Sequence, residues 1–527
     1  MPIASTSAEA FAAAVARGHD RPFLHYFDAA LSYGEVDRQS DALAAALQAD
    51  GFRHGDRFCA QTQSIPQFVI AMMAVWKLGG VFVPANPMYR TRELQLILED
   101  ARPTAFMAEA HLLAEVYEAI DGGHRPRTVL SASAAAYGAL DARIAPRPAS
   151  ASGTAFDDVL DVIARFDGRK PLAPDIRPDD IGCLVYTSGT TGLPKGAINT
   201  QQGLALGGKI ARDSHELPEY GTVLALAPLF HISGVVMTIT MAIDAVASVI
   251  LSYRFHPEII VEAIDRLSPS VSAGSITAFI AIMNAPNARP EVIAKLKTPM
   301  SGGAPVPASV ADEYHQRFGI PLRTGYGLTE TTGAAFMEPL AEPRRVDPET
   351  GSLSVGKALP TFTVAVLDET GAPAPVGGPG EVVISGPCVS PGYWRKPEES
   401  DASMRAEGFY TGDIGFFDAD GWLYLIDRKK DVIIAGGYKV WPREVEDVIY
   451  CHPAIREAAV IGTKDAYRGE TVKAVVSLKP GASVSIEALA AFCRERLAAY
   501  KAPREIVIIP ELPKNPSGKI LRRELRD

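Results

Sequence analysis

Apolar and polar positions alternate between helical and strand-like patterns over residues 1–125. Val69–Leu78 precedes Gly79-Gly80, and the pattern predicts a helix that ends at these glycines. The apolar run Val81–Val83 predicts a short strand directly after it. Helices that alternate with short strands are typical of βα units, so we predict an α/β fold with parallel-rich sheets. Similar apolar runs predict further buried strands at Ile181–Tyr186, Val223–Ala227 and Val382–Ser385.

A different pattern begins after the charged run 428–431. Strand-like runs at Ala458–Ile461 and Val472–Leu478 precede one amphipathic helix, and Glu505–Ile509 predicts a last strand. The apolar positions of that helix recur with helical spacing at Ile486, Leu489, Ala490, Cys493 and Leu497. We therefore predict a large multi-subdomain N-terminal body over residues 1–427, a hinge at 428–430, and a small mobile α+β domain at 431–527.

Two segments bear on membrane targeting. The first residues, MPIASTSAEAFAAAVARG, lack a basic start and a continuous apolar stretch, so they predict an Ala-rich helix rather than a leader peptide. Ile232–Leu251 is nearly all apolar, but it contains Asp244, whose charge is costly inside a bilayer. This stretch therefore predicts a buried helix, a core strand at Ala247–Leu251, and no transmembrane segment.

Composition and charge narrow the class of protein. Of 527 residues, 47% are apolar and 22% are charged, which excludes a wholly disordered chain. The net charge of -10 argues against a nucleic-acid partner, and it means that an anionic ligand must be held by local donors. The five cysteines form no CxxC pair, so they give no support to a zinc site. So few cysteines in a long chain indicate a reducing cytoplasm.

The segment Tyr186–Gly196 carries the strongest chemical signal, because a buried strand runs into a loop of Ser, Thr and Gly that ends at Lys195. The glycines allow successive N–H groups to form a nest for phosphate oxygens, and the hydroxyls and the lysine add donors. The alternative is an ordinary flexible turn, but so many specified positions favour phosphate binding. A Walker A loop is excluded because Pro194 precedes the lysine. The predicted contacts are Thr187, Ser188, Gly189, Thr190, Thr191, Gly192 and Lys195.

With this loop, the chain resembles the adenylate-forming superfamily over nearly its whole length, from about Phe23 to Arg523. That superfamily contains acyl-CoA and aryl-CoA synthetases, luciferases and the adenylation domains of peptide synthetases. The resemblance implies a C-terminal domain that rotates between two reaction steps. It also implies ATP, Mg²⁺ and the co-substrate coenzyme A.

Further motifs combine their own chemistry with the resemblance, although each alone also fits an ordinary turn. Thr324–Glu330 offers a stacking face at Tyr326 and a carboxylate at Glu330 that suits Mg²⁺. Asp413 fits a carboxylate that accepts two ribose hydroxyls, and the family pattern implies that Arg428 reaches the same sugar. The family also places the small residues after Ser301 along the adenine pocket. The predicted nucleotide contacts are Gly303, Ala304, Thr324, Gly325, Tyr326, Gly327, Thr329, Asp413 and Arg428, with Glu330 as the metal ligand.

Near the C-terminus, Gly518 allows a sharp turn that projects Lys519. Alone this lysine fits a solvated charge, but it matches the family's catalytic lysine, which bridges the substrate carboxylate and the α-phosphate of ATP. The resemblance implies that Lys430 is the hinge and that rotation brings a narrow pantetheine tunnel to the site. The predicted tunnel residues are Gly436, Gly437, Tyr438 and Lys439. We expect Arg522, Arg523 and Arg526 to form a solvated basic face.

The identity of the acid is less strongly indicated. His231 alone fits a core histidine, and the family places this position beside the acyl pocket, near the carboxylate. The expected pocket segments hold no Lys or Arg, which favours an apolar tail: Ile232–Met237, Ser275–Phe279 and Gly325–Phe336. Phe230–Ser233 also lacks the Asp that pairs with an amino group in amino-acid-activating relatives. A medium- or long-chain fatty acid is therefore our first expectation, and an aromatic acid is the second.

Together these inferences predict an ATP-dependent carboxylic acid–CoA ligase that acts through an acyl-adenylate and releases AMP and pyrophosphate. The predicted catalytic residues are Thr187, Lys195, His231, Glu330 and Lys519. A luciferase-like oxygenase shares the ATP motifs and stays open, as does a non-catalytic nucleotide-binding protein, although such a scaffold would be expected to lack Lys519, Glu330 or Asp413. The expected partners are the acid, ATP and coenzyme A, and the sequence leaves a homodimer open.

Overall fold

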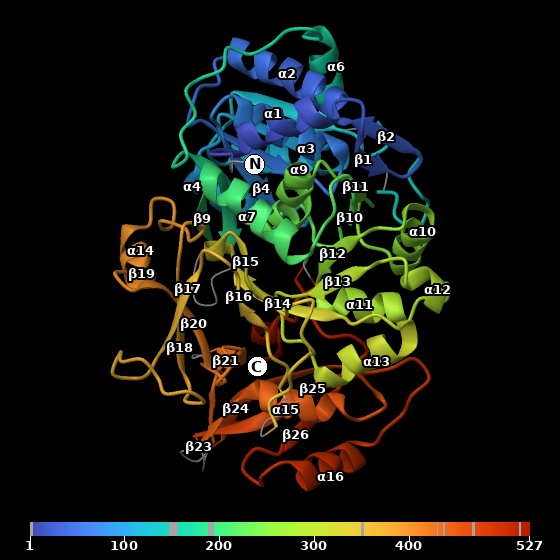
Figure 1. The fold of residues 1–527 in the computed structure, drawn as a ribbon, viewed down its shortest axis with the longest axis vertical. Coiled ribbons are helices and arrows are strands. Elements are labelled where there is room, and N and C mark those ends of the chain that lie inside the picture. Colours follow the sequence, from blue (N-terminus) through green and yellow to red (C-terminus); the bar gives the residue numbers. More distant parts are fainter. Residues whose placement is uncertain are drawn as a thin grey trace.

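The protein is described here by a computed structural model that covers residues 4–146, 156–187, 194–348, 352–428, 431–435, 438–465, 469–515 and 518–526. The strands of these residues form four sheets. The N-terminal elements lie at the top of Figure 1, and the sheet built from the last part of the chain lies at the bottom. The predicted α/β class with parallel-rich sheets is confirmed, as the next two sheets show.

The seven-stranded sheet ends in the hairpin that flanks the predicted phosphate loop. All its neighbouring strands are parallel except the last pair, β8 and β9. Its order is β7 (Asp157–Asp158), β6 (Thr128–Ala132), β5 (Ala105–Glu109), β3 (Arg57–Gln61), β4 (Val81–Ala85), β8 (Ile181–Thr187) and β9 (Lys195–Thr200).

The nine-stranded sheet has a parallel centre and antiparallel edges. Its order is β16 (Lys357–Ala358), β15 (Gly333–Met337), β14 (Arg323–Leu328), β13 (Thr298–Ser301), β12 (Val271–Gly274), β10 (Thr222–Leu224), β11 (Ser248–Leu251), β1 (Pro22–Tyr26) and β2 (Ala29–Ser32). Strands β13 and β14 lead into two of the predicted nucleotide motifs.

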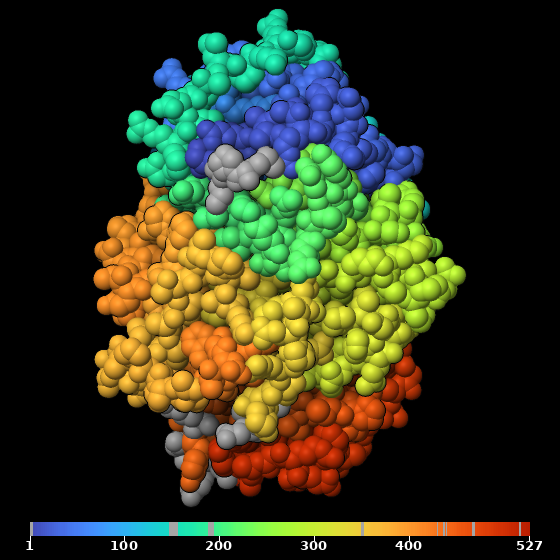
Figure 2. All heavy atoms as spheres, in the orientation of Figure 1, coloured from blue at the N-terminus to red at the C-terminus, as the bar shows by residue number. Residues whose placement is uncertain are grey.

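Two smaller sheets complete the molecule. The antiparallel one contains β17 (Thr363–Leu367), β18 (Gly380–Ser385), β20 (Gly408–Phe417), β19 (Met404–Arg405) and β21 (Leu423–Arg428), with α14 (Pro397–Ser403) before β19. The C-terminal one contains β23 (Tyr438–Val440), β22 (Ile433–Ala435), β25 (Gly469–Leu478), β24 (Ile455–Asp465) and β26 (Glu505–Ile508), with α15 (Pro442–Tyr450), α16 (Ile486–Arg496) and the 3-10 helix η4 (Arg522–Leu525). The C-terminal sheet has an apolar cluster of its own, and in Figure 2 its red surface lies against the middle of the chain.

The core joins the two large sheets. α3 (Pro66–Lys77) is buried from Pro66 to Trp76, because apolar residues surround the helix on every side. One apolar cluster contains this helix together with residues of both sheets, such as Phe82 and Val249. The other helices in this part are α1 (Ser7–Gly18), α2 (Tyr33–Ala49), α4 (Thr91–Ala101), α5 (Leu113–Asp121), α6 (Val159–Arg165), α7 (Gln201–Ser214), α8 (Ile232–Gly234), α9 (Met241–Ala245), α10 (Pro257–Leu267), α11 (Ile276–Met283), α12 (Pro290–Ile293) and α13 (Ala308–Phe318), with short 3-10 turns η1 (Ala110–Leu112) and η3 (Thr329–Thr331).

The apolar stretch Ile232–Leu251 folds as predicted, as helix followed by the core strand β11. Between α8 and α9 it adopts a π-helix, η2 (Val235–Thr240), and every residue of that turn is buried. Within the described part of the chain, no helix has the length and apolar character needed to cross a bilayer. The predicted apolar face of α16 is wrong at one end: Leu489 and Cys493 are buried, but Ile486 is 44% exposed because the whole first turn faces solvent.

Helix α7 packs closely against the π-helix through two glycines. A Cβ atom on Gly208 would lie 2.6 Å from the carbonyl carbon and oxygen of Thr240, and one on Gly207 would lie 3.1 Å from the Val236 side chain. Backbone atoms cannot move aside as a flexible side chain can. These glycines are therefore required by the close approach of the two helices.

We expect Gly208→Ala to lower the free energy of unfolding by roughly 1–3 kcal/mol, despite the better helix propensity of alanine, because the new methyl group meets backbone atoms. Thermal and denaturant unfolding would measure the change. Gly122→Ala is the matched control, since its Cβ would meet chiefly the flexible end of the Gln95 side chain at 2.5 Å. Equal stability of the two variants would contradict this packing argument.

Candidate active site

The β8–β9 hairpin places the two described ends of the predicted phosphate loop opposite each other. Thr187 pairs with Lys195 across the hairpin, and the Thr187 hydroxyl donates to the Lys195 carbonyl oxygen at 3.4 Å. The rest of the predicted loop lies outside the described residues: Ser188, Gly189, Thr190, Thr191 and Gly192. The phosphate role of this loop stays a prediction.

Tyr393, which the sequence analysis did not single out, links two predicted site residues. Its hydroxyl donates a hydrogen bond to Glu330 Oε1 at 2.7 Å. The Lys195 Nζ atom lies 5.3 Å from the centroid of the Tyr393 ring, which is within the range of a cation–π contact. The only sequence signal was an aromatic pair, Tyr393-Trp394, after a Pro-Gly step. This tyrosine connects the end of the phosphate loop with the predicted metal ligand.

Glu330 is held in place from two sides. The Asn199 amide donates to the Thr329 carbonyl oxygen at 2.9 Å and to the Thr332 hydroxyl at 3.0 Å. The Ser390 N–H donates to the Glu330 carbonyl oxygen at 2.7 Å. The Glu330 side chain is buried, and within the described residues its Oε2 atom accepts no hydrogen bond. A buried carboxylate with one oxygen that accepts no hydrogen bond from the described residues fits Mg²⁺, which typically binds one or two carboxylates plus substrate phosphates.

Asp413 and Arg428 face each other across β20 and β21. The Arg428 Nε atom lies 2.7 Å from Asp413 Oδ1, and the Tyr326 hydroxyl donates to Asp413 Oδ2. Burial disfavours the charge on Arg428, but the neighbouring carboxylates, Asp413 first, outweigh burial and raise the arginine pKa. Three predicted nucleotide contacts therefore form one polar group, in which Tyr326 and Asp413 are buried and Arg428 is partly exposed.

The predicted adenine segment leaves open space beside a glycine. Gly303 follows β13 with a φ of +76°, which favours glycine, and a Cβ atom there would meet nothing within 4 Å. The preceding Gly302 approaches the strand of Gly325 closely, because its Cβ would lie 3.0 Å from the Gly325 carbonyl oxygen. Gly303 and the adjacent Ala304 thus lie beside the strand that carries Tyr326, as a base pocket requires.

Three other predicted nucleotide contacts serve packing in the structure. The Thr324 hydroxyl donates to the Ser354 carbonyl oxygen at 2.7 Å. A Cβ atom on Gly325 would lie 2.9 Å from the Met300 sulfur, and one on Gly327 would lie 2.0 Å from the Gly333 carbonyl oxygen. These positions accept only small groups, because β14 and its neighbours lie so close together.

His231 directly precedes α8, with its ring centroid 5.0 Å from that of Phe230. Within the described residues, its buried Nε2 atom has no hydrogen-bond partner. Burial lowers the pKa of the imidazole to about 4, so the ring is neutral at pH 7. A neutral imidazole with an unpaired ring nitrogen can bind a polar ligand group at the start of the apolar α8–η2 segment.

The C-terminal loop brings Lys519 to the Asp413–Arg428 pair. The Thr277 hydroxyl donates to the Gly518 carbonyl oxygen at 3.0 Å, so the loop is docked on the start of α11. The Lys519 side chain keeps contact with solvent, but surrounding protein atoms desolvate its ammonium group. Desolvation and repulsion from Arg428 both lower the pKa of Lys519, and the attraction of Asp413 offsets them only in part. The resulting pKa is about 8.

Of the four predicted tunnel residues, the structure describes Tyr438 and the backbone of Lys439. Tyr438 is 61% exposed and its ring stacks on Tyr500 with centroids 4.8 Å apart. Lys439 contributes the middle of the short strand β23. Gly436, Gly437 and the hinge residue Lys430 lie outside the described residues. The structure leaves the described end of this hairpin facing solvent.

The expectation of a solvated basic face after Lys519 is wrong for one of its three arginines. Arg522 is only 19% exposed and forms ion pairs with Asp427 at 3.1 Å and Glu446 at 2.8 Å. Arg523 is exposed, and Arg526 pairs with Asp431 at 3.2 Å on the surface. Glu446 and Asp427 are 76 and 95 residues away from Arg522 along the chain, so no local sequence pattern could predict these ion pairs.

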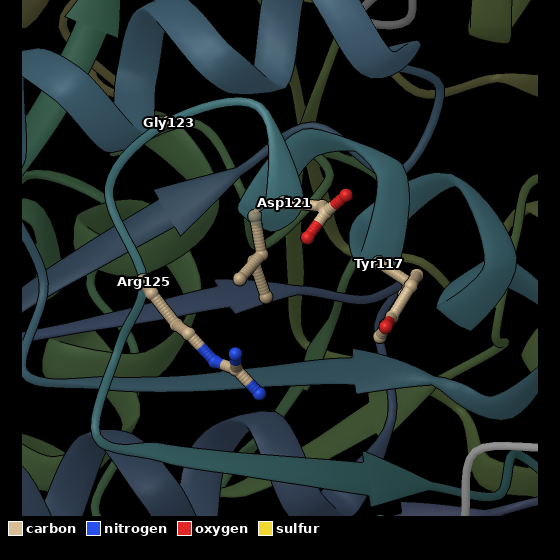
Figure 3. A pocket seen from close by; sticks show the side chains of 5 residues that line it. Tyr117, Asp121, Gly123 and Arg125 are labelled. Carbon is tan, nitrogen blue, oxygen red and sulfur yellow. The ribbon is translucent and has the colours of Figure 1, made fainter.

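A separate cavity of about 160 Å³ lies at the end of α5 and contains none of the predicted site residues. Figure 3 shows the side chains around it, which come from α5 and from the loop that follows this helix. They are Tyr117, Ile120, Asp121, Gly123 and Arg125. The candidate active site is therefore defined by the residues gathered around Asp413 and Glu330 and not by this cavity.

Family models match most of the chain. The AMP-binding enzyme model covers residues 11–394, and the model of its C-terminal domain covers residues 444–519. The chain therefore belongs to the AMP-binding enzyme family. The predicted resemblance to the acyl-CoA synthetase branch of the adenylate-forming enzymes is confirmed by its relatives.

Among these relatives is a long-chain-fatty-acid–CoA ligase of Bacillus subtilis, 34% identical over 97% of this chain and 92% of that protein. A feruloyl-CoA synthase of Amycolatopsis is 33% identical over 94% of each chain. The crystal structure of ATP-bound MatB from Rhodopseudomonas palustris is similar with a TM-score of 0.85, 28% identity and 98% coverage of both chains.

The lowered pKa of Lys519 predicts how ATP binding depends on pH. Lysine is charged below its pKa, so this cation is present below about pH 8 and is lost as the pH rises through 8. We expect the affinity for ATP, measured by calorimetry, to fall by about tenfold between pH 7 and pH 9.5, because one phosphate-binding charge disappears. Lys519→Arg stays charged and is expected to remove this fall. A fall of the same size in that variant would contradict the assignment.

Tyr393→Phe tests the role of the hydroxyl of this tyrosine separately from that of its ring. The ring that faces Lys195 is kept, while Glu330 loses a hydrogen bond that is charge-assisted and therefore worth roughly 1.5–3 kcal/mol. We expect the Mg²⁺ concentration needed for half-maximal ATP binding to rise by about tenfold or more. Tyr410→Phe is the control, since the Tyr410 hydroxyl reaches only the exposed Glu407. An unchanged Mg²⁺ requirement would show that the hydroxyl does not orient the carboxylate.

Proposed function

We propose that this protein is an ATP-dependent carboxylic acid–CoA ligase that forms an acyl-adenylate and then an acyl-CoA thioester. The observation that carries the proposal is the position of Lys519, which a docked C-terminal loop holds beside the Asp413–Arg428 pair. A cation delivered to a nucleotide pocket by a separate domain suits a reaction at the α-phosphate of ATP. The curated relatives named as acid–CoA ligases support the same reaction.

The first step joins the acid to AMP. A carboxylate oxygen attacks the α-phosphorus of ATP, the bond from that phosphorus to the bridging oxygen breaks, and pyrophosphate leaves. The protein contributes position and charge: Asp413 and Arg428 hold the ribose, Lys519 bridges the carboxylate and the α-phosphate, and Thr187 and Lys195 face the leaving phosphates. His231 contacts the carboxylate as a neutral donor. Glu330 would hold Mg²⁺, which would neutralise charge on the phosphates.

The second step transfers the acyl group to coenzyme A. The thiol sulfur attacks the acyl carbonyl carbon, the mixed anhydride bond breaks, and AMP leaves. We propose that the C-terminal domain, residues 431–527, rotates against the body, residues 1–427, about Lys430 in the 428–430 hinge. The separate apolar cluster of the C-terminal sheet supports movement as one unit. Rotation would bring Gly436, Gly437, Tyr438 and Lys439 to line the pantetheine path, which suits the exposed position of Tyr438.

A medium- or long-chain fatty acid is the substrate that we propose. The segment after His231 is apolar and buried at Val235, Val236 and Met237 of the π-helix, so its composition suits a hydrocarbon tail. The relatives named as long-chain-fatty-acid–CoA ligases support this choice. An aryl acid is the second candidate, because a relative of comparable identity is named as a feruloyl-CoA synthase. We further propose a cytoplasmic location, which the five free cysteines support.

A panel of acids tests this function. Purified protein is incubated with ATP, Mg²⁺, coenzyme A and one acid at a time, from short to long fatty acids and on to cinnamic and benzoic acids, and AMP, pyrophosphate and acyl-CoA are quantified. We expect equal amounts of AMP and acyl-CoA, with the largest amounts for medium or long chains. Hydrolysis of ATP to ADP and orthophosphate would overturn the proposal. Oxygen-dependent consumption of the adenylate would favour a luciferase-like oxygenase.

Lys519→Ala is expected to divide the two steps. Acid-dependent exchange of pyrophosphate into ATP should fall by about 100-fold or more, because the variant lacks the cation at the reacting phosphate. Thioester formation from supplied acyl-adenylate and coenzyme A should change by less than about threefold, since Lys519 has left the site by then. Lys464→Ala, at an exposed position of β24, is the control. Equal losses in both steps would contradict this division of roles.

A further inference from the structure

Arg522 is bound by carboxylates from two different parts of the molecule. It lies three residues after Lys519, in η4. Its Nη2 atom donates to both oxygens of Glu446 at 2.8 and 2.9 Å, and its Nη1 atom donates to Asp427 Oδ1 at 3.1 Å. The guanidinium is largely desolvated, and the two carboxylates outweigh burial and hold its pKa above the usual value. A third carboxylate, Asp431 of the C-terminal domain, has its Oδ2 atom 3.7 Å from Nη1. A largely buried arginine that several acids bind fixes the direction of the chain that carries it.

The two carboxylates lie on opposite sides of the predicted hinge. Glu446 belongs to α15, which packs on the C-terminal sheet, and its other contact is the Val460 N–H at 2.7 Å. Asp427 lies in β21, directly before the ribose-binding Arg428. The contact between Arg522 and Glu446 therefore stays within the C-terminal domain. The contact between Arg522 and Asp427 joins that domain to the body.

Asp427 collects contacts from both sides of the hinge. It accepts the Arg522 guanidinium, the Arg443 N–H at 3.0 Å and the Arg428 N–H at 2.8 Å. The residue beside it, Arg428, pairs with Asp413. A single carboxylate thus links the loop of Lys519, the start of α15 and the strand that holds the predicted ribose site.

We propose that Arg522 is a positioning residue that aligns Lys519 with the nucleotide through Asp427 and thereby serves the adenylate-forming step alone. This inference rests on the proposed function. The lysine side chain is long and flexible, and apart from Arg522 its loop is tied to the body by the bond from Thr277 to Gly518. The charged bonds of Arg522 add a second anchor on the other side of Lys519. When the domain rotates, Arg522 travels with Glu446 and leaves Asp427.

The competing explanation is that Arg522 only stabilises the C-terminal domain through Glu446. That explanation predicts equal damage to both reaction steps, because each step needs a folded C-terminal domain. The positioning role predicts damage to the first step alone. Asp427→Asn distinguishes the two most sharply, because it removes the charge that Arg522 meets on the body and leaves the pair between Arg522 and Glu446 intact. One amide oxygen remains for the N–H groups of Arg428 and Arg443.

The experiment compares Arg522→Ala, Arg522→Lys and Asp427→Asn with wild type and with Arg523→Ala, the exposed neighbouring arginine. Pyrophosphate exchange measures the first step, and thioester formation from supplied acyl-adenylate measures the second. We expect Arg522→Ala to lose about 100-fold in the first step, since a shift of about 1 Å at a reacting group can cost that much. Arg522→Lys should recover only part, because an ammonium cannot serve both carboxylates as the planar guanidinium does.

Asp427→Asn is expected to lose about tenfold in the first step and to leave the second within about threefold of wild type, as Arg523→Ala leaves both. Equal losses in both steps, or an unchanged first step in Asp427→Asn and Arg522→Ala, would overturn the positioning role. Thermal unfolding of each variant reports whether Arg522→Ala still folds, and Asp427→Asn decides the question if it does not. Failure of the proposed function itself is recognised separately, by wild-type protein that forms no acid-dependent AMP.

Discussion

The ion pair between Arg428 and Asp413 is the interaction on which the rest of this site depends. A protein with a net charge of -10 repels a nucleotide at long range, so the charges that bind it must be local and fixed. Arg428 is desolvated, held by Asp413 and placed at the last residue of β21, where the body of the protein ends. The Tyr326 hydroxyl donates a hydrogen bond to the second oxygen of Asp413. The ammonium group of Lys519 is close enough to interact electrostatically with both Arg428 and Asp413. The proposed ribose contact and the proposed hinge are therefore adjacent in the chain, at Arg428.

Several of the contacts that dock the C-terminal domain are polar and individually modest. Arg443 donates to the Leu425 carbonyl oxygen at 2.8 Å, Ser352 donates to Asp447 at 3.1 Å, and Lys479 pairs with Glu313 at 3.2 Å. Water can replace each of these contacts, whereas an apolar interface would resist separation. The chemistry of these contacts is therefore compatible with the proposed movement of the domain.

Local patterns predicted the fold well, because the strands of a parallel sheet are short apolar runs that β4 and β8 display directly. The nucleotide motifs were also visible, since each is a contiguous segment. Contacts between distant residues were not visible: Tyr393 meets Glu330 across 63 residues, and Arg522 meets Asp427 across 95. Arg522 was misjudged because a basic run near a chain end looks solvated until the carboxylates around it are known. The prediction for the first turn of α16 was wrong because apolar spacing identifies one face of a helix but does not show whether other elements cover the whole of that face.

The π-helix beside His231 has a consequence for how this protein can change. Its backbone accommodates one more residue per turn than the usual hydrogen-bonding pattern, so the loss of a single residue could be absorbed by a return to α-helical geometry. Such a deletion would turn the remaining side chains of the segment by about 100° around the helix axis. In the acyl pocket proposed above, a different set of side chains would then face the acid, and the contact of Gly208 with the Thr240 backbone would be rebuilt. Insertion and deletion, more than point substitution, would be an economical evolutionary route to a different acid.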